Sequence, residues 1–259
     1  MTTAHVPGEH HVVADTDETL VAGVVADYLG AGLARGDGAV VIATSAHTRG
    51  FTQRLIAGGI DVDHAIAARD LLVLDAERTL ARLMVDGRLD GGVFRSAITE
   101  AVEHVCANGD RPVCFYGEMV DLLRPTRFDA ALELEQLWNA VLAEGPRLSL
   151  LCGYRLDALD RQAHGVLGRI ARCHSHLLAV NVSERFEAAV DRAYADVFGV
   201  GGDVAVLREL MVTRQPWPHG LPPAYAALLA LDDLPPLIAN DVRARARRYY
   251  REGLHAESS

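Results

Sequence analysis

Val113-Cys114-Phe115-Tyr116-Gly117-Glu118-Met119-Val120 is a short apolar run that passes through one glycine and one carboxylate into a helix start. The run is typical of a buried strand followed directly by a helix. In an open α/β fold ligands bind beside the carboxyl ends of the strands, so Glu118 at this junction can meet a ligand's donor or a metal. The alternative is that Glu118 only complements the dipole of the helix it opens.

The same alternation of strands and helices continues on both sides of this run. Strands are expected at residues 11–13, 39–43, 71–74, 113–116, 148–152 and 175–180, and helices at 17–34, 48–57, 76–85, 93–107, 128–143 and 162–173. Strands separated by helices require a mainly parallel sheet with helices on both faces, joined by right-handed crossovers. The predicted fold class is therefore α/β.

The pattern changes near residue 182, after which helices follow one another without strands. They are expected at 183–198, 203–212, 223–231 and 235–252, with prolines between the second and the third. The sequence thus predicts two domains: an α/β domain over 1–182 and a helical C-terminal domain over 183–259.

Composition excludes several classes of protein. The chain has 259 residues, of which 50% are hydrophobic and 23% charged, as in globular proteins. The formal net charge of −10 disfavours unspecific adhesion to nucleic acid or anionic lipid. The chain contains no lysine, which excludes Schiff-base catalysis and the phosphate-binding lysine of nucleotide loops.

Cysteine usage and hydropathy bear on the compartment. The four cysteines are Cys106, Cys114, Cys152 and Cys173, without C-x-x-C spacing, and no signal peptide precedes them. No apolar run approaches the roughly 20 residues that span a bilayer. We therefore expect a cytoplasmic protein with reduced thiols and no membrane segment.

Motifs for nucleotide binding and for catalysis are absent from the sequence. The turn after the first expected strand, at residues 14–18, reads ADTDE and has three carboxylates but neither glycine nor lysine, so it does not suit a triphosphate. No G-x-S-x-G, H-E-x-x-H or EF-hand motif occurs. We predict no enzyme and no catalytic residues, and the cofactor remains unknown.

Several short pieces occur in a specific order along the chain. They are residues 8–13 (GEHHVV), 29–33 (LGAGL), 72–84 (LVLDAERTLARLM), 116–123 (YGEMVDLL), 132–139 (LELEQLWN), 149–154 (SLLCGY) and 173–176 (CHSH). In this order they resemble the MEDS family, the methanogen/methylotroph, DcmR-type sensory domains, over about residues 10–180.

The resemblance implies a RecA-like fold without a phosphate-binding loop, in an intracellular sensor of small organic molecules that works with DNA-binding or kinase-like output modules. It implies regulation and not catalysis. The tract after the family's histidine is short here, and Ala14 and Asp15 stand where an aromatic residue is usual. Both His10 and His11 therefore remain candidates for that histidine.

The candidate ligand-binding residues come from strand ends and from the resemblance. They are His10, His11, Tyr116, Glu118, Cys152, Tyr154, His174 and Ser175. His11, Glu118 and Cys152 are expected at the carboxyl ends of parallel strands, which converge on one crevice. The alternative is that each histidine and Cys152 is an ordinary buried residue.

Part of this set could also hold a metal. His11, Glu118, Cys152 and His174 offer nitrogen, oxygen and sulfur ligands that suit zinc or iron. No pair is fixed by helical i, i+4 spacing, and no metal is predicted. On the helix over 128–143, Trp138 is expected in the core or at a dimer face, and Glu133 and Glu135 in solvent.

A basic stripe marks the last expected helix. Its arginines are Arg243, Arg245, Arg247, Arg248 and Arg251, interleaved with Tyr249 and Tyr250. Such a stripe can hold nucleic acid or an acidic protein, but no helix-turn-helix pattern precedes it. A protein partner or self-association is favoured.

These observations lead to a hypothesis of a cytoplasmic signal-sensing protein. A small organic effector binds at the strand ends, and residues 183–259 pass the change to a protein partner, which is a kinase, a regulator or a second copy. One alternative is an enzyme that uses Glu118 with His11 or His174 as acid and base. The other is an adaptor module without a ligand.

Overall fold

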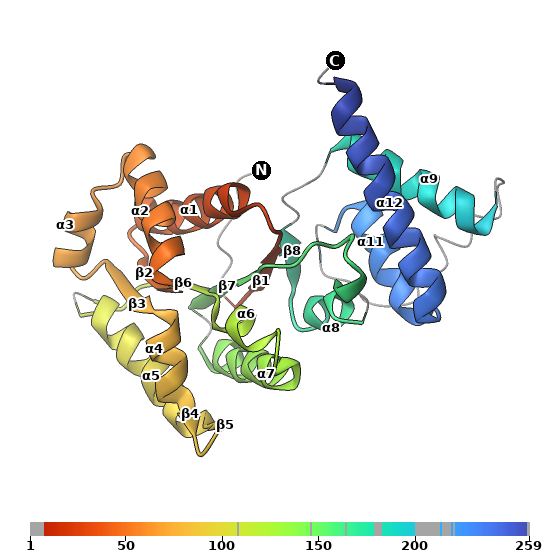
Figure 1. Ribbon diagram of the computed structural model, residues 1–259. Coiled ribbons are helices and arrows are strands. Elements are labelled where there is room, and N and C mark those ends of the chain that lie inside the picture. The colour runs from red at the N-terminus through yellow and green to blue at the C-terminus, as the bar shows by residue number, and fades with distance from the viewer. Residues whose placement is uncertain are drawn as a thin grey trace. The chain divides into compact units, whose positions relative to one another are not determined.

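A computed structural model describes residues 8–257, except 108, 146, 164, 179–182, 200–212, 214–218 and 220 (Figure 1). The chain folds into two compact units. Unit 1 comprises Met1–Val13 and Asp17–Tyr154, and unit 2 comprises Ala14–Thr16 and Arg155–Ser259. This division falls after Tyr154, whereas the sequence pattern places its boundary at residue 182.

Unit 1 is built on a parallel sheet, which confirms the predicted α/β class. Its strands are β1 (His10–Ala14), β2 (Gly38–Ala43), β3 (Leu71–Asp75), β6 (Val113–Gly117) and β7 (Leu148–Tyr154). They lie in the order β3-β2-β6-β7-β1. The register is parallel where β6 pairs on both sides, with Tyr116 opposite Val41 and Leu151. Continuous apolar strands are what a sheet covered on both faces requires.

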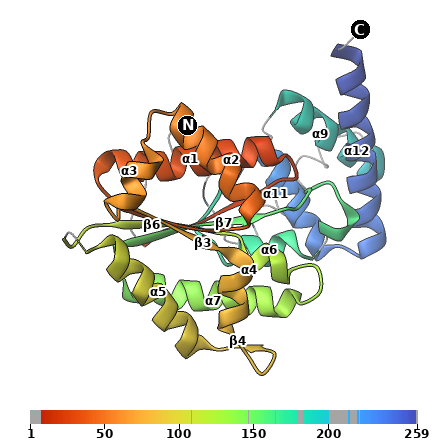
Figure 2. The same ribbon diagram turned by 60° about the vertical axis from the view of Figure 1, so that its left-hand side comes forward.

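Helices cover both faces of this sheet (Figure 2). On one face lie α1 (Glu18–Arg35) and α2 (Ser45–Ala57), and on the other lie α5 (Gly91–Val105) and α7 (Phe128–Glu144). The remaining helices of unit 1 are α3 (Val62–Ala67), α4 (Ala76–Leu83) and α6 (Met119–Leu123). The Asp17 side chain caps the first turn of α1, and Gly36 ends this helix with φ of 86°.

A short hairpin replaces the end of the helix predicted over 76–85. Its strands are β4 (Met84–Val85) and β5 (Arg88–Leu89), which pair antiparallel. Asp86 and Gly87 join them with φ of 49° and 77°. Positive φ at both central residues is the signature of a two-residue hairpin turn, for which Asp-Gly is a preferred pair. Helix α3 was not predicted either, whereas α6 is the helix expected to start directly after Glu118.

Successive residues of each strand serve opposite faces of the sheet. On β6, Phe115 packs against Trp138 of α7 with ring centroids 5.3 Å apart, whereas Tyr116 packs against Phe51 of α2 at 5.0 Å. Trp138 is buried, so the core position predicted for it is confirmed. Residues adjacent in sequence can therefore belong to different sites.

Unit 2 is mainly helical in its described part. It contains η1 (Arg161–Ala163), α8 (Leu167–Ala171), β8 (His176–Leu178), α9 (Glu184–Phe198), α11 (Pro223–Ala230), η2 (Leu231–Asp233) and α12 (Pro236–Glu257). Phe186 of α9 contacts the rings of Tyr225 and Tyr250. The helix expected over 203–212 lies outside the described residues. Among the helices that are described, none combines the length and apolar character needed to cross a membrane.

The predicted basic stripe does not form a uniform cationic face. Arg243 is fully buried and donates to the Leu228 carbonyl at 2.8 Å and to Asp232 at 3.1 Å. Arg247 donates to Asp157 and to Asp160, at 2.5 and 3.1 Å. Arg245 and Arg248 form ion pairs with Asp241 and Glu252, so four of the five arginines serve contacts inside unit 2.

Candidate functional site

One candidate site surrounds Glu118 at the carboxyl ends of β2 and β6. The Glu118 carboxylate is buried directly after β6, and its Oε1 accepts from the Thr44 N–H at 2.6 Å. Its Oε2 accepts from the Tyr116 hydroxyl at 3.0 Å and lies 2.7 Å from Nδ1 of His47. Thr44 and His47 come from the junction of β2 and α2, next to β6 in the sheet. We call these four residues the Glu118 site.

The surroundings of Glu118 favour its ionised form. Burial alone raises the pKa of this carboxyl, but the hydrogen bond from His47, the Thr44 N–H and the charge of His47 together lower it below the ordinary value. Burial and the neighbouring carboxylate raise the pKa of Tyr116, so its hydroxyl stays protonated and donates. The His47 side chain is 30% exposed, so the site reaches the surface. An ionised carboxylate in this setting can bind a cation or a hydrogen-bond donor.

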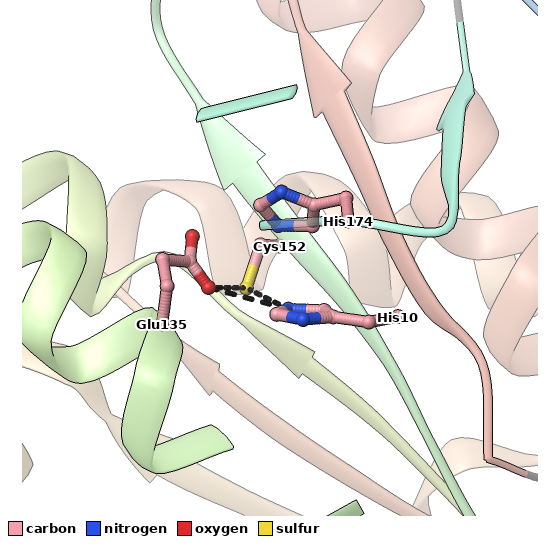
Figure 3. Close-up of side chains that lie close together, drawn as sticks. All are labelled: His10, Glu135, Cys152 and His174. Carbon is pink, nitrogen blue, oxygen red and sulfur yellow. Dashed lines mark hydrogen bonds and ion pairs between the residues drawn. The ribbon is translucent and has the colours of Figure 1, made fainter. Parts of the chain in front are cut away.

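A second cluster lies between the sheet and α7. His10 opens β1, Cys152 lies in β7 and Glu135 projects from α7, and all three are buried (Figure 3). Nε2 of His10 lies 3.3 Å from Sγ of Cys152 and 3.2 Å from Oε2 of Glu135. The distance between Sγ and Oε2 is 3.4 Å. We call these three residues the His10 cluster.

Two further side chains hold the His10 cluster in place. Nδ1 of His10 lies 2.9 Å from Oδ1 of Asn139, also on α7. The Tyr154 hydroxyl donates to Oε1 of Glu135 at 2.5 Å. The imidazole and the carboxylate are thus each hydrogen-bonded through the atom that points away from the cluster, while Nε2 and Oε2 face the thiol.

His11 belongs to neither group. It follows His10 in β1 and points to the opposite face, where its ring centroid lies 6.2 Å from that of Tyr28 in α1. Its Nε2 lies 3.1 Å from Oε2 of Glu9. The structure therefore gives the two adjacent histidines separate surroundings.

The last two predicted residues, His174 and Ser175, lie in unit 2. His174, also drawn in Figure 3, is buried, and its Nδ1 lies 2.7 Å from the Ile170 carbonyl. The Ser175 carbonyl accepts from the His219 N–H at 2.8 Å.

Apart from His11, the predicted site residues of unit 1 thus fall into two groups on different faces of the sheet. Tyr116 and Glu118 lie together, and so do His10, Cys152 and Tyr154. In the described part of the chain, the imidazole in contact with Glu118 is that of His47, not of His11. The expectation that His11 ends the first strand is wrong, because β1 begins at His10 and runs to Ala14.

Sequence reasoning missed three residues of these groups: Glu135, His47 and Thr44, which contributes its backbone N–H. Glu135 was expected in solvent but is fully buried, because it shares the buried face of α7 with Ala131, Trp138 and Leu142. That helical spacing was a readable signal. His47 carried no comparable signal, since its contact with Glu118 depends on β2 lying beside β6.

Residues 10–175 match the profile of a family described as MEDS, the MEthanogen/methylotroph, DcmR Sensory domain. Among solved structures, the chain is similar to a KaiC-like protein from the hyperthermophilic archaeon Pyrococcus horikoshii OT3, with 13% identity and a TM-score of 0.46. That similarity covers 67% of this chain and 71% of the archaeal one. No curated protein matches the sequence.

Proposed function

The chain belongs to the MEDS family of sensory domains, and on this premise we propose that it is a cytoplasmic signal-sensing protein that binds a small organic effector at the Glu118 site. The change on binding passes to a regulatory protein partner. The protein acts in signal transduction or transcription regulation and does not transform its effector.

The observation that carries this proposal is the buried carboxylate at the carboxyl ends of two neighbouring strands. Open α/β sheets bind their ligands outside these strand ends. Glu118 is held there by backbone and side-chain donors, and the partly exposed His47 gives access from solvent. The carboxylate is therefore pre-oriented for a ligand group that replaces or joins His47.

The chemistry of Glu118 limits the class of effector. An ionised carboxylate only accepts hydrogen bonds, so the ligand must present a donor. Hydroxyl and amino groups meet this requirement. We therefore propose small alcohols or amines as the effector class.

A route for the signal begins at His47. This residue lies in the first turn of α2, so an effector that displaces it from Oε2 of Glu118 also changes what holds the start of that helix. A ligand shifts a conformational equilibrium only by its differential affinity for the two states. Residues 183–259 are the proposed transmitting part, with a kinase, another regulator or a second copy as partner and without a role in nucleic-acid binding.

Titration of the full chain with short-chain alcohols and amines tests the proposal. We expect saturable binding by calorimetry, weakened about tenfold or more in Glu118→Gln, because hydrogen bonds to charged groups contribute about 1.5–3 kcal/mol. Glu133→Gln, on the exposed face of α7, is the matched control and should bind as the wild type does. Equal binding by Glu118→Gln would overturn the proposal.

A second candidate function is acid–base catalysis by Glu118 and His47. Their 2.7 Å separation is within the reach that proton transfer requires. Turnover of a bound alcohol or amine that stops in His47→Gln would support this function over sensing. An adaptor without a ligand would be supported by two results together: native mass spectrometry finds no retained small molecule, and the titration finds no binding.

A further inference from the structure

We propose that His10, Glu135 and Cys152 form a zinc site inside unit 1. This site is separate from the Glu118 site and lies on the other face of the sheet. The proposal therefore does not depend on the proposed effector.

The first argument is the spacing of the three potential ligand atoms. Their separations are 3.2, 3.3 and 3.4 Å, which makes a nearly equilateral triangle. Tetrahedral zinc with bonds of about 2.0–2.3 Å places its nitrogen, oxygen and sulfur ligands about 3.4–3.6 Å apart. The triangle therefore matches one face of such a tetrahedron after a small outward shift of the side chains.

The second argument concerns protons. Oδ1 of Asn139 faces Nδ1 of His10, so Nδ1 carries a hydrogen and Nε2 of a neutral ring presents its lone pair to the cluster. Oε2 of an ionised Glu135 is also an acceptor. The Cys152 thiol supplies only one proton, although three short contacts join Nε2, Oε2 and Sγ. A divalent cation satisfies all three atoms at once.

The third argument is the support behind the ligands. Zinc-bound histidines usually donate their other ring N–H to a protein oxygen, and ligating carboxylates are themselves hydrogen-bonded. Asn139 and Tyr154 take these two roles at 2.9 and 2.5 Å. Both hydrogen bonds orient the ligand atoms toward the centre of the triangle.

The donor set selects the metal. Magnesium and calcium take oxygen ligands, whereas a combination of imidazole, thiolate and carboxylate suits zinc. Three protein ligands from unit 1 leave the fourth tetrahedral position for water or another donor. Binding would deprotonate Cys152 and neutralise the cost of burying an ionised Glu135.

Cobalt(II), a spectroscopic substitute for zinc, provides the probe for the full chain. We expect one cobalt per chain, a thiolate-to-cobalt charge-transfer band in the near ultraviolet, and loss of this band when zinc is added. Cys152→Ser should abolish the band and weaken zinc binding more than about 100-fold, because even outer partners of a metal site change affinity 10–100-fold.

Cys114→Ser is the matched control. Cys114 is a buried cysteine of the neighbouring strand β6, and its Sγ contacts the Gly38 carbonyl on the side of α1. Burial raises the pKa of its thiol to about 12, so it stays protonated at neutral pH. This variant should keep the band and the zinc affinity, as should Glu118→Gln, which separates this proposal from the effector site.

Two results would overturn the zinc site. One is a folded wild-type chain that gives no charge-transfer band, which would leave a metal-free hydrogen-bonded cluster. The other is a band that persists in Cys152→Ser. If Cys152→Ser does not fold, a chain that keeps only Cys152, with the other three cysteines replaced by serine, decides the matter, and loss of the band there contradicts the proposal.

Discussion

At the scale of single residues, the two buried glutamates of unit 1 show how surroundings decide a role. Glu118 faces an N–H, an O–H and an imidazole, which together keep it ionised. Glu135 faces a thiol and an imidazole nitrogen, a set suited to a cation. The sequence pointed to Glu118 because a glycine and a helix start flank it, whereas Glu135 differs from the exposed Glu133 only by its position on the buried face of α7.

The lowered pKa of Glu118 predicts a dependence of stability on pH. The folded-state pKa of Glu118 lies below the ordinary value of 4.5. Its contribution to the free energy of unfolding is therefore complete above pH 4.5 and is lost as the pH falls through the folded-state pKa. Glu118→Gln should cost about 1–3 kcal/mol at pH 7, and the difference from the wild type should shrink below pH 4.5. Urea unfolding between pH 7 and pH 3 measures both effects.

Glu133→Gln serves as the comparison, because this exposed carboxyl should leave the free energy of unfolding nearly unchanged at each pH. A constant difference between the wild type and Glu118→Gln over the whole pH range would contradict an ionised, hydrogen-bonded Glu118.

At the scale of elements, helical periodicity predicted α7 and the burial of Trp138. The same periodicity also places Glu135 on the buried face, but Glu135 was predicted to lie in solvent only because its side chain is charged. The hairpin of β4 and β5 was missed for another reason. Four strand residues are too few to show a period, and only Asp86 and Gly87 marked the turn.

Arg243 of α12 allows a test of packing within unit 2. Its guanidinium is buried against Asp232 and the Leu228 carbonyl, and Asp232 also accepts from the Gly165 and Gly168 N–H groups. Arg243→Ala leaves this carboxylate without its cation, and we expect a loss of about 3–5 kcal/mol in the free energy of unfolding. Chemical denaturation followed by circular dichroism measures it.

Arg251→Ala is the control on the same helix. This side chain is exposed, so its removal should change stability by no more than about 0.5 kcal/mol. Equal effects of the two substitutions would mean that the buried ion pair contributes little.

At the scale of the whole molecule, the α/β class was predictable because each segment carries its own period. The order of the strands was not, since β2 lies beside β6 although about 70 residues separate them in the chain. The contact of Glu118 with His47 and that of His10 with Cys152 both depend on this order. Local patterns therefore identified residues of both groups but not which residues meet.

The charge of the whole chain predicts weak contact with nucleic acid. The net charge is −10, and Arg243, Arg245, Arg247 and Arg248 of the basic stripe already lie beside carboxylates within unit 2. We expect no shift of random duplex DNA at physiological salt in an electrophoretic mobility assay, because phosphate contacts require free cationic groups. A shift that disappears in Arg245→Ala with Arg248→Ala would show that these two arginines form a DNA-binding face.

Two consecutive residues of strand β7 face the two groups of polar residues, the His10 cluster and the Glu118 site. Cys152 points toward α7, whereas the next residue, Gly153, lies against Tyr116, where even a methyl group would overlap the hydroxyl. One extra residue inserted between Leu148 and Cys152 would turn each following side chain to the other face. The length of this strand is thus fixed from both sides.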